Sequence, residues 1–173
     1  MTVVVWIVEA TWHACADAAR VHAPPDAEIV LLHVTGPEAV DAAEGAYAGL
    51  LGRSRSGRDP GTEVARLAAE AADSLLTGAA ERVGRPCVRV ERSGRAEREV
   101  VAAAEGAGLL IVARDGDRAR LGPRSLGPAT RFVVDHAPCP VLLVWPGTAP
   151  DPATIPPPPQ GPPPPAPAGP AGG

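Results

Sequence analysis

Five short apolar runs, separated by longer segments of mixed character, dominate the pattern of this sequence. Because such runs are too short to form buried helices, each one predicts a β-strand. The predicted strands span residues 3–8, 28–34, 87–91, 109–113 and 141–145. Strands that alternate with helices favour an α/β fold, with a five-stranded, mostly parallel sheet, helices on both faces and right-handed crossovers.

The segments between these runs carry the signals of helices. Thr11 is a suitable N-cap for the first predicted helix, and Pro37 suits the first position of the second. Gly52 and Gly84 are placed to end the second and third helices. The predicted helices span residues 12–21, 37–51, 62–83, 95–105 and 129–136, and residues 53–61 are predicted to form a loop.

The sequence divides into a folding part and a proline-rich tail. From Pro146 onward the chain is almost wholly Pro, Ala and Gly, so it holds too little apolar surface to offset the entropy of ordering. We therefore expect one α/β domain over residues 1–146 and a disordered tail over residues 147–173, without regular structure after about Pro150. Binding to a proline-recognising partner is an alternative use of the tail.

The charge and the cysteine content indicate which partners and which cellular compartment to expect. The net charge is −4, which does not favour nucleic acid or a membrane surface as a partner. The three cysteines are widely spaced, as is typical of a reduced compartment, and the N-terminal apolar run ends at Glu9, too early for a membrane span. We expect a cytoplasmic protein. The scattered positions of His13, Cys15, His136 and Cys139 predict no metal site.

A glycine- and arginine-bearing loop, residues 114–127, joins the fourth run to the last predicted helix. In α/β proteins, backbone N–H groups and a helix N-terminus at such a place bind anions, and we expect those of Gly127, Ala129 and Thr130 to be free for one. The segments that follow the first, second and fourth strands converge at one edge of a parallel sheet, where ligands sit. The candidate ligand-binding residues at this edge are Glu9, Thr11, Val34, Arg114, Asp117, Arg118, Gly127, Ala129 and Thr130.

The C-terminal part of the predicted domain resembles the universal stress protein family. The segment SLGPATRFVVDHAPCPVLLVW follows the family's pattern without a gap from Gly127 to Val141, and VVVWIVEAT and AEIVLLHV are weaker matches. The resemblance covers about residues 3–145. It implies a Rossmann-like fold of the adenine nucleotide alpha hydrolase type, with ATP as the candidate cofactor.

The resemblance also implies a departure at the phosphate-binding loop. The ATP-binding branch of the family carries G-x2-G-x9-G-[ST], and the register set by Gly127 puts Arg114, Asp117, Gly127 and Pro128 at the four defined positions. Only Gly127 is kept, and Glu9 stands where the family has an Asp that contacts adenine. Side chains at the first two positions crowd the phosphates, and Pro128 removes an N–H donor, so we expect weak or absent ATP binding.

Two interpretations of this loop are open. In the first, arginines replace the lost backbone donors, since guanidinium groups grip phosphate well. These arginines are Arg114, Arg118, Arg120 and Arg124. In the second, the loop is a solvated connection in which Asp115 and Asp117 pair with those arginines.

These observations predict a non-enzymatic regulatory or binding protein of the universal stress type, since no catalytic base or nucleophile stands out. The alternatives are a nucleotide-hydrolysing enzyme of the same architecture and a dimeric scaffold that recruits partners through its tail. We expect a homodimer through Val141–Trp145, because an apolar strand at a sheet edge must be covered.

Overall fold

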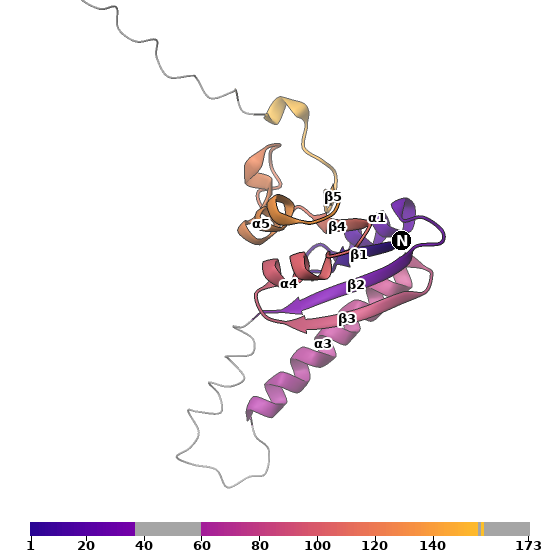
Figure 1. The fold of residues 1–173 in the computed structure, drawn as a ribbon. Helices are drawn as coiled ribbons and strands as arrows, with labels where there is room; N and C mark the ends of the chain where they lie inside the picture. Colours follow the sequence, from indigo (N-terminus) through magenta and orange to yellow (C-terminus); the bar gives the residue numbers. More distant parts are fainter. Residues whose placement is uncertain (37–59, 156, 158–173) are drawn as a thin grey trace, which may run out of the picture.

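A single parallel sheet forms the centre of the protein. The computed structural model describes residues 1–36, 60–155 and 157. Its strands are β1 (Thr2–Trp6), β2 (Glu28–Thr35), β3 (Cys87–Ser93), β4 (Leu109–Ala113) and β5 (Val141–Val144). They lie in the order β3-β2-β1-β4-β5, and every neighbouring pair is parallel (Figure 1). The predicted α/β class is confirmed, and the sheet is wholly rather than mostly parallel.

Helices cover both faces of this sheet. The helices α1 (Trp12–His22) and α3 (Pro60–Val83) pack on one face, and α4 (Ala96–Ala103) and α5 (Pro128–His136) pack on the other. The helix expected over residues 37–51 and most of the loop expected after it lie outside the described residues. The predicted loop ends two residues too late, because α3 begins at Pro60, a residue suited to the first turn of a helix.

Buried apolar side chains of β1 hold the two layers of helices to the sheet. Val3 and Val5 pack toward α1 and α3, whereas Val4 and Trp6 pack toward α4 and α5. All four are buried, which explains why the run is continuously apolar rather than alternating. Burial of each such side chain contributes about 1.5–3 kcal/mol to folding.

The start of α1 differs from the prediction. Thr11 stands at the N-cap position, but its side chain makes no capping hydrogen bond. The residue is buried, and its backbone supports the turn instead: the Thr11 N–H donates to the Val8 carbonyl at 2.9 Å, and its own carbonyl accepts from the Ala14 N–H at 3.1 Å. The polar side chain at this position is therefore not what sets the start of the helix.

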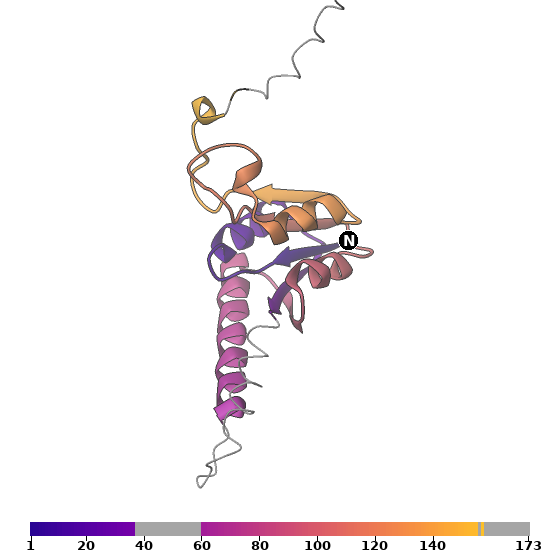
Figure 2. The same ribbon diagram turned by 90° about the vertical axis from the view of Figure 1, so that its left-hand side faces the viewer.

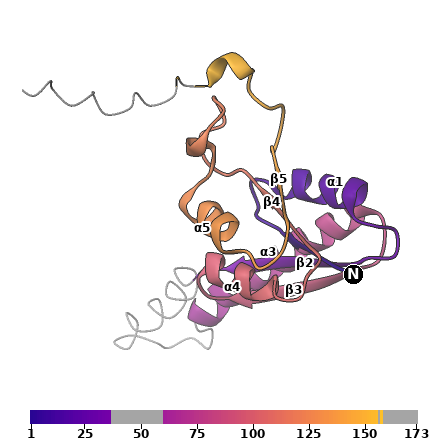
Figure 3. The ribbon, with the colours of Figure 1, turned by 45° about the horizontal axis from the view of Figure 1, so that its top comes forward.

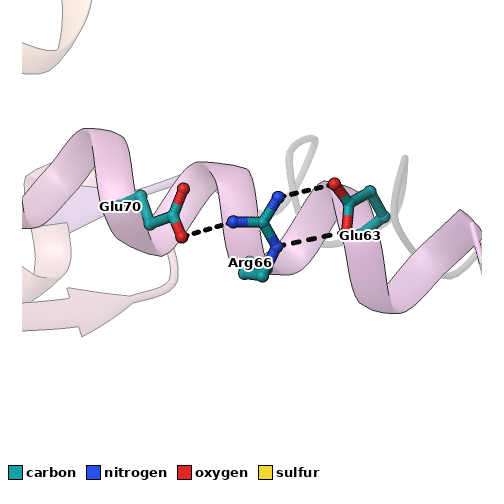
Figure 4. A network of polar contacts seen from close by, with 3 residues as sticks. All are labelled: Glu63, Arg66 and Glu70. Atoms are coloured by element: carbon teal, nitrogen blue, oxygen red, sulfur yellow. Dashed lines mark hydrogen bonds and ion pairs between the residues drawn. The ribbon is translucent and has the colours of Figure 1, made fainter.

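The first half of α3 extends beyond the edge of the sheet (Figure 2). Along this part, the Arg66 guanidinium pairs with the carboxylates of Glu63 and Glu70, one turn before and one turn after it (Figure 4). The second half packs on α1, where the guanidinium of Arg82 donates to both carboxylate oxygens of Asp17 at 2.9 and 2.7 Å. Side-chain pairs one turn apart stabilise a helix where it extends beyond the sheet.

The segment after β5 contains a short 3-10 turn, η2 (Pro152–Thr154). The expectation of no regular structure after about Pro150 is wrong at this turn. The Asp151 carboxylate accepts a hydrogen bond from the Ala153 N–H at 2.7 Å and so caps the turn locally. The tail beyond residue 157 lies outside the described residues. Within the described part of the chain, no helix has the length and apolarity needed to cross a membrane.

Candidate functional site

The carboxyl ends of the strands define the candidate site. The chain proceeds from β1 to β2 and β3 on one side and later occupies β4 and β5 on the other, so the strand order reverses between β1 and β4. Ligands of open α/β sheets bind outside the carboxyl ends of the strands at such a point. Glu9 follows β1 and Arg114 follows β4, so both flank the reversal, as the sequence predicts.

The β4–α5 loop, residues 114–127, folds back on itself at this point. The Gly116 N–H donates to the Ser125 carbonyl at 3.0 Å, and the Asp117 N–H donates to the Arg124 carbonyl at 2.8 Å. A Cβ at Gly116 would lie 2.8 Å from the carbonyl carbon of Ser125 and closer still to the Arg124 oxygen. Glycine at this position therefore permits close approach of two backbone segments rather than approach of a ligand.

The carboxylate of Asp115 occupies the N-terminus of α5. Its Oδ1 accepts a hydrogen bond from the Gly127 N–H at 2.7 Å, and a Cβ at Gly127 would lie 2.8 Å from Asp115 Oδ2. The expectation that the Gly127 N–H is free for an anion is therefore wrong. A negative side chain at a helix N-terminus satisfies an N–H that has no partner within the helix and interacts favourably with the helix dipole.

The remaining predicted residues of the α5 first turn differ in accessibility. Pro128 is the first helical residue and carries no N–H, as the sequence indicates. Ala129 is half-buried, and the side chain of Thr130 is buried. Their N–H groups belong to the first turn, which leaves them without acceptors inside the helix.

Arg114 turns toward the sheet edge. Its Nη1 donates to the Ser125 hydroxyl, and its guanidinium carbon lies 4.7 Å from the centre of the Trp145 ring, a cation–π arrangement. The Ser125 side chain is fully buried and also donates to the Gly122 carbonyl at 2.7 Å. Arg114 therefore anchors the loop to the end of β5, and its hydrogen bond is made to Ser125 within the loop.

Ser125 and Trp145 are residues that sequence reasoning missed as partners in this site. Nothing in the local pattern points to either of them. The buried position of Ser125 follows from the turn η1 (Pro123–Ser125), and the place of Trp145 follows from the end of β5.

The tip of the loop is polar and exposed. Asp117 accepts a hydrogen bond from the Ala119 N–H at 2.9 Å and lies 3.7 Å from Arg120 Nε. Arg118 and Arg124 are also exposed. The interpretation in which loop aspartates pair with arginines thus holds for Asp117, whereas Asp115 binds the backbone of Gly127 instead.

The predicted residues after β1 and at the end of β2 lie at the same edge of the sheet. Glu9 is exposed, whereas Thr11 and Val34 are buried. His33, which sequence reasoning did not select, contacts the end of β1 through its Nδ1, 2.9 Å from the Ile7 carbonyl oxygen. Only Glu9 among these residues therefore offers a charged group to a ligand at the edge.

One further feature lies away from this edge. A cavity of about 460 Å³, lined by residues 25–29 and 85–88, lies where β2 and β3 begin, at the opposite end of the sheet. There Arg85 Nη1 donates to the Pro24 carbonyl at 2.8 Å. In the described ranges of the chain, no three His, Cys, Asp or Glu side chains gather in a way that could hold a metal ion.

The fold and this edge define a doubly wound α/β protein, with the candidate ligand loop after β4. The chain belongs to the universal stress protein family, whose family model matches residues 2–144. No curated protein sequence matches the chain significantly.

Solved structures carry the same fold. The hypothetical protein MJ0577 superposes with a TM-score of 0.60 at 19% identity, over 83% of this chain and 94% of that one. A universal stress protein solved in complex with cAMP gives 0.56 at 18% identity, over 85% and 98% of the two chains. The universal stress protein UspA from Lactobacillus plantarum gives 0.51 at 17% identity, over 83% and 97%. The predicted family and fold are confirmed.

Proposed function

We propose that this chain is a non-enzymatic, ligand-binding regulatory protein of the universal stress type, with a loop that binds adenine nucleotides weakly. One observation carries the proposal: the Asp115 carboxylate accepts the Gly127 N–H at 2.7 Å, at the helix end where a phosphate would bind. The protein's own anion therefore competes with that of a nucleotide. The cAMP complex of a similar fold makes adenine nucleotides the natural probes.

The state of the loop carboxylates supports binding rather than catalysis. Asp115 is engaged with the α5 backbone, and Asp117 is engaged with the Ala119 N–H and lies near Arg120. A general base needs a carboxylate that is free to accept a proton, and both of these already accept hydrogen bonds from backbone N–H groups. We propose a cytoplasmic location, which agrees with the free thiols of Cys15, Cys87 and Cys139.

The test is calorimetric titration of the wild-type chain and of Asp115→Ala with Mg-ATP and with cAMP. The substitution frees the Gly127 N–H and removes a negative charge, so we expect nucleotide affinity to rise by about tenfold, the equivalent of one charge-assisted hydrogen bond. Asp115→Asn keeps a capping oxygen but loses the charge, and its affinity should fall between the two.

Asp135→Ala is the matched control, because Asp135 is an exposed carboxylate at the opposite end of the same helix from Gly127. Its nucleotide affinity should equal that of the wild type. If neither nucleotide binds the wild type or Asp115→Ala at millimolar concentration, the proposed nucleotide site does not exist.

We also propose that the protein forms a homodimer through β5. The two edges of the sheet differ in character: β3 carries exposed charged residues such as Arg89 and Glu91, whereas β5 reads Val-Leu-Leu-Val. Charged side chains protect a sheet edge from pairing, and an apolar edge strand invites it.

The register of the β4–β5 ladder indicates which groups would pair. Leu110 and Arg114 donate to the carbonyls of Pro140 and Val144. Because backbone groups alternate in direction along a strand, those of Val141 and Leu143 point away from β4. A second β5 across a twofold axis satisfies them.

Sedimentation velocity at micromolar concentration tests this assembly. The expected result is twice the chain mass for the wild type, and a shift toward the monomer in Leu143→Pro, which removes an outward N–H without adding charge. A wild-type mass equal to that of one chain ends the proposal.

A further inference from the structure

The segment that follows β5, residues 146–155, runs to the tip of the β4–α5 loop. The Leu121 N–H in the loop donates to the Thr154 hydroxyl oxygen at 3.0 Å, a contact between residues far apart in the sequence. Figure 3 shows η2 beyond the outer end of the loop, and Figures 1 and 2 show the same arrangement. The two segments thus meet at the tip of the loop.

The hydroxyl that receives this bond is held in a fixed direction. The Thr154 hydroxyl donates to the Asp151 carbonyl at 2.6 Å, which leaves its oxygen to accept from Leu121. The Thr154 N–H also donates to the Asp151 carbonyl, and the Asp151 carboxylate caps the turn. Prolines at positions 150 and 152 restrict the backbone on both sides of Asp151.

A continuous chain of contacts leads from this hydroxyl to the N-terminus of α5. Leu121 precedes Gly122, whose carbonyl accepts both the N–H and the hydroxyl of Ser125, at 3.1 and 2.7 Å. The Ser125 carbonyl in turn accepts the Gly116 N–H, and Gly116 is the neighbour of Asp115. These hydrogen bonds and chain neighbours join the loop tip to Asp115, the residue that occupies the helix end.

We propose that residues 146–155 act as an autoinhibitory strap, which holds the β4–α5 loop closed and keeps Asp115 on Gly127. Release of the strap favours an open loop, in which a phosphate-bearing ligand reaches α5. The identity of the ligand rests on the proposed function, whereas the mechanical coupling does not.

Amide hydrogen exchange of the full-length chain tests the coupling. Thr154→Val removes the acceptor and keeps the shape of the side chain. The informative amides are those of Gly116 and Asp117, because they bond within the loop and do not contact the strap. Loss of one hydrogen bond should speed their exchange by about two- to tenfold.

Thr148→Val is the matched control, because Thr148 is an exposed threonine of the same segment. In the Thr148→Val protein, the amides of Gly116 and Asp117 should exchange as in the wild type. If Thr154→Val accelerates only the Leu121 amide and leaves these two unchanged, the strap does not control the loop and the proposal is wrong. Asp151→Ala, which removes the cap of the turn, should act in the same direction as Thr154→Val.

Binding of inorganic phosphate and of cAMP separates this inference from the proposed function. If the strap is autoinhibitory, Thr154→Val should bind either probe about two- to tenfold more tightly than the wild type. Faster exchange with no binding of either probe overturns the nucleotide site and the inhibitory role, and leaves only the mechanical coupling. Equal binding by both proteins, with unchanged exchange, overturns the strap and leaves the nucleotide site standing.

Discussion

Substitution of Gly116 by alanine should open the β4–α5 loop. The added Cβ would meet backbone atoms of Arg124 and Ser125, which cannot move without breaking the pairing of the two loop segments. Overpacking of this kind costs about 1–3 kcal/mol. Loss of the two backbone hydrogen bonds, from Gly116 and Asp117, costs about 0.5–1.5 kcal/mol each, which gives a similar sum.

We therefore expect Gly116→Ala to lower the free energy of unfolding by about 2 kcal/mol. For a domain of this size, such a loss corresponds to a melting temperature lower by roughly 4–8 °C, measured by differential scanning calorimetry. Gly147→Ala is the control, because a Cβ at Gly147 meets no atom within 4 Å. A Gly116→Ala protein that melts together with this control, and still protects the Asp117 amide from exchange, would refute the close backbone pairing.

Two further predictions concern the nucleotide motif and the buried thiol. The combined change Arg114→Gly, Asp117→Gly and Pro128→Ser should raise the Mg-ATP affinity measured by calorimetry by about tenfold or more, because it restores close backbone approach and one N–H donor at the helix start. If the unmodified chain binds Mg-ATP tightly and the changes do not affect this, the alignment of the ATP-binding motif on Gly127 is wrong. Burial raises the pKa of the Cys15 thiol from 9.0 to about 12, so above pH 9 the unfolded chain loses this proton first and stability falls as pH rises. The Cys15 contribution to this decrease should reach about 1.4 kcal/mol per pH unit in urea titrations above pH 9. Cys15→Ala should lose that contribution and keep only those of Cys87 and Cys139, whose pKa values burial also raises, so equal slopes for the two proteins would contradict the burial of the Cys15 thiol.

The sequence alone determined where most of the regular elements lie. The runs that predict β2 and β4 agree with the observed strands to within one residue at each end, and the apolar stripe predicts α3 closely. These elements depend on local periodicity and on residues that begin or end a helix, which short stretches of sequence contain in full. The segment resembling universal stress proteins similarly pointed to the family that the family model confirms.

Only the tertiary structure decided what occupies the ligand edge. The bond from Gly127 to Asp115, the stacking of Arg114 on Trp145 and the contact of Leu121 with Thr154 join residues that no short-range pattern relates. Loop paths follow from such distant pairings, because backbone groups outside helices and strands take whichever partners the assembled fold brings near. The composition shows that the loop contains arginines and aspartates. Only the structure shows that the carboxylate of one of them, Asp115, accepts the Gly127 N–H at the N-terminus of α5.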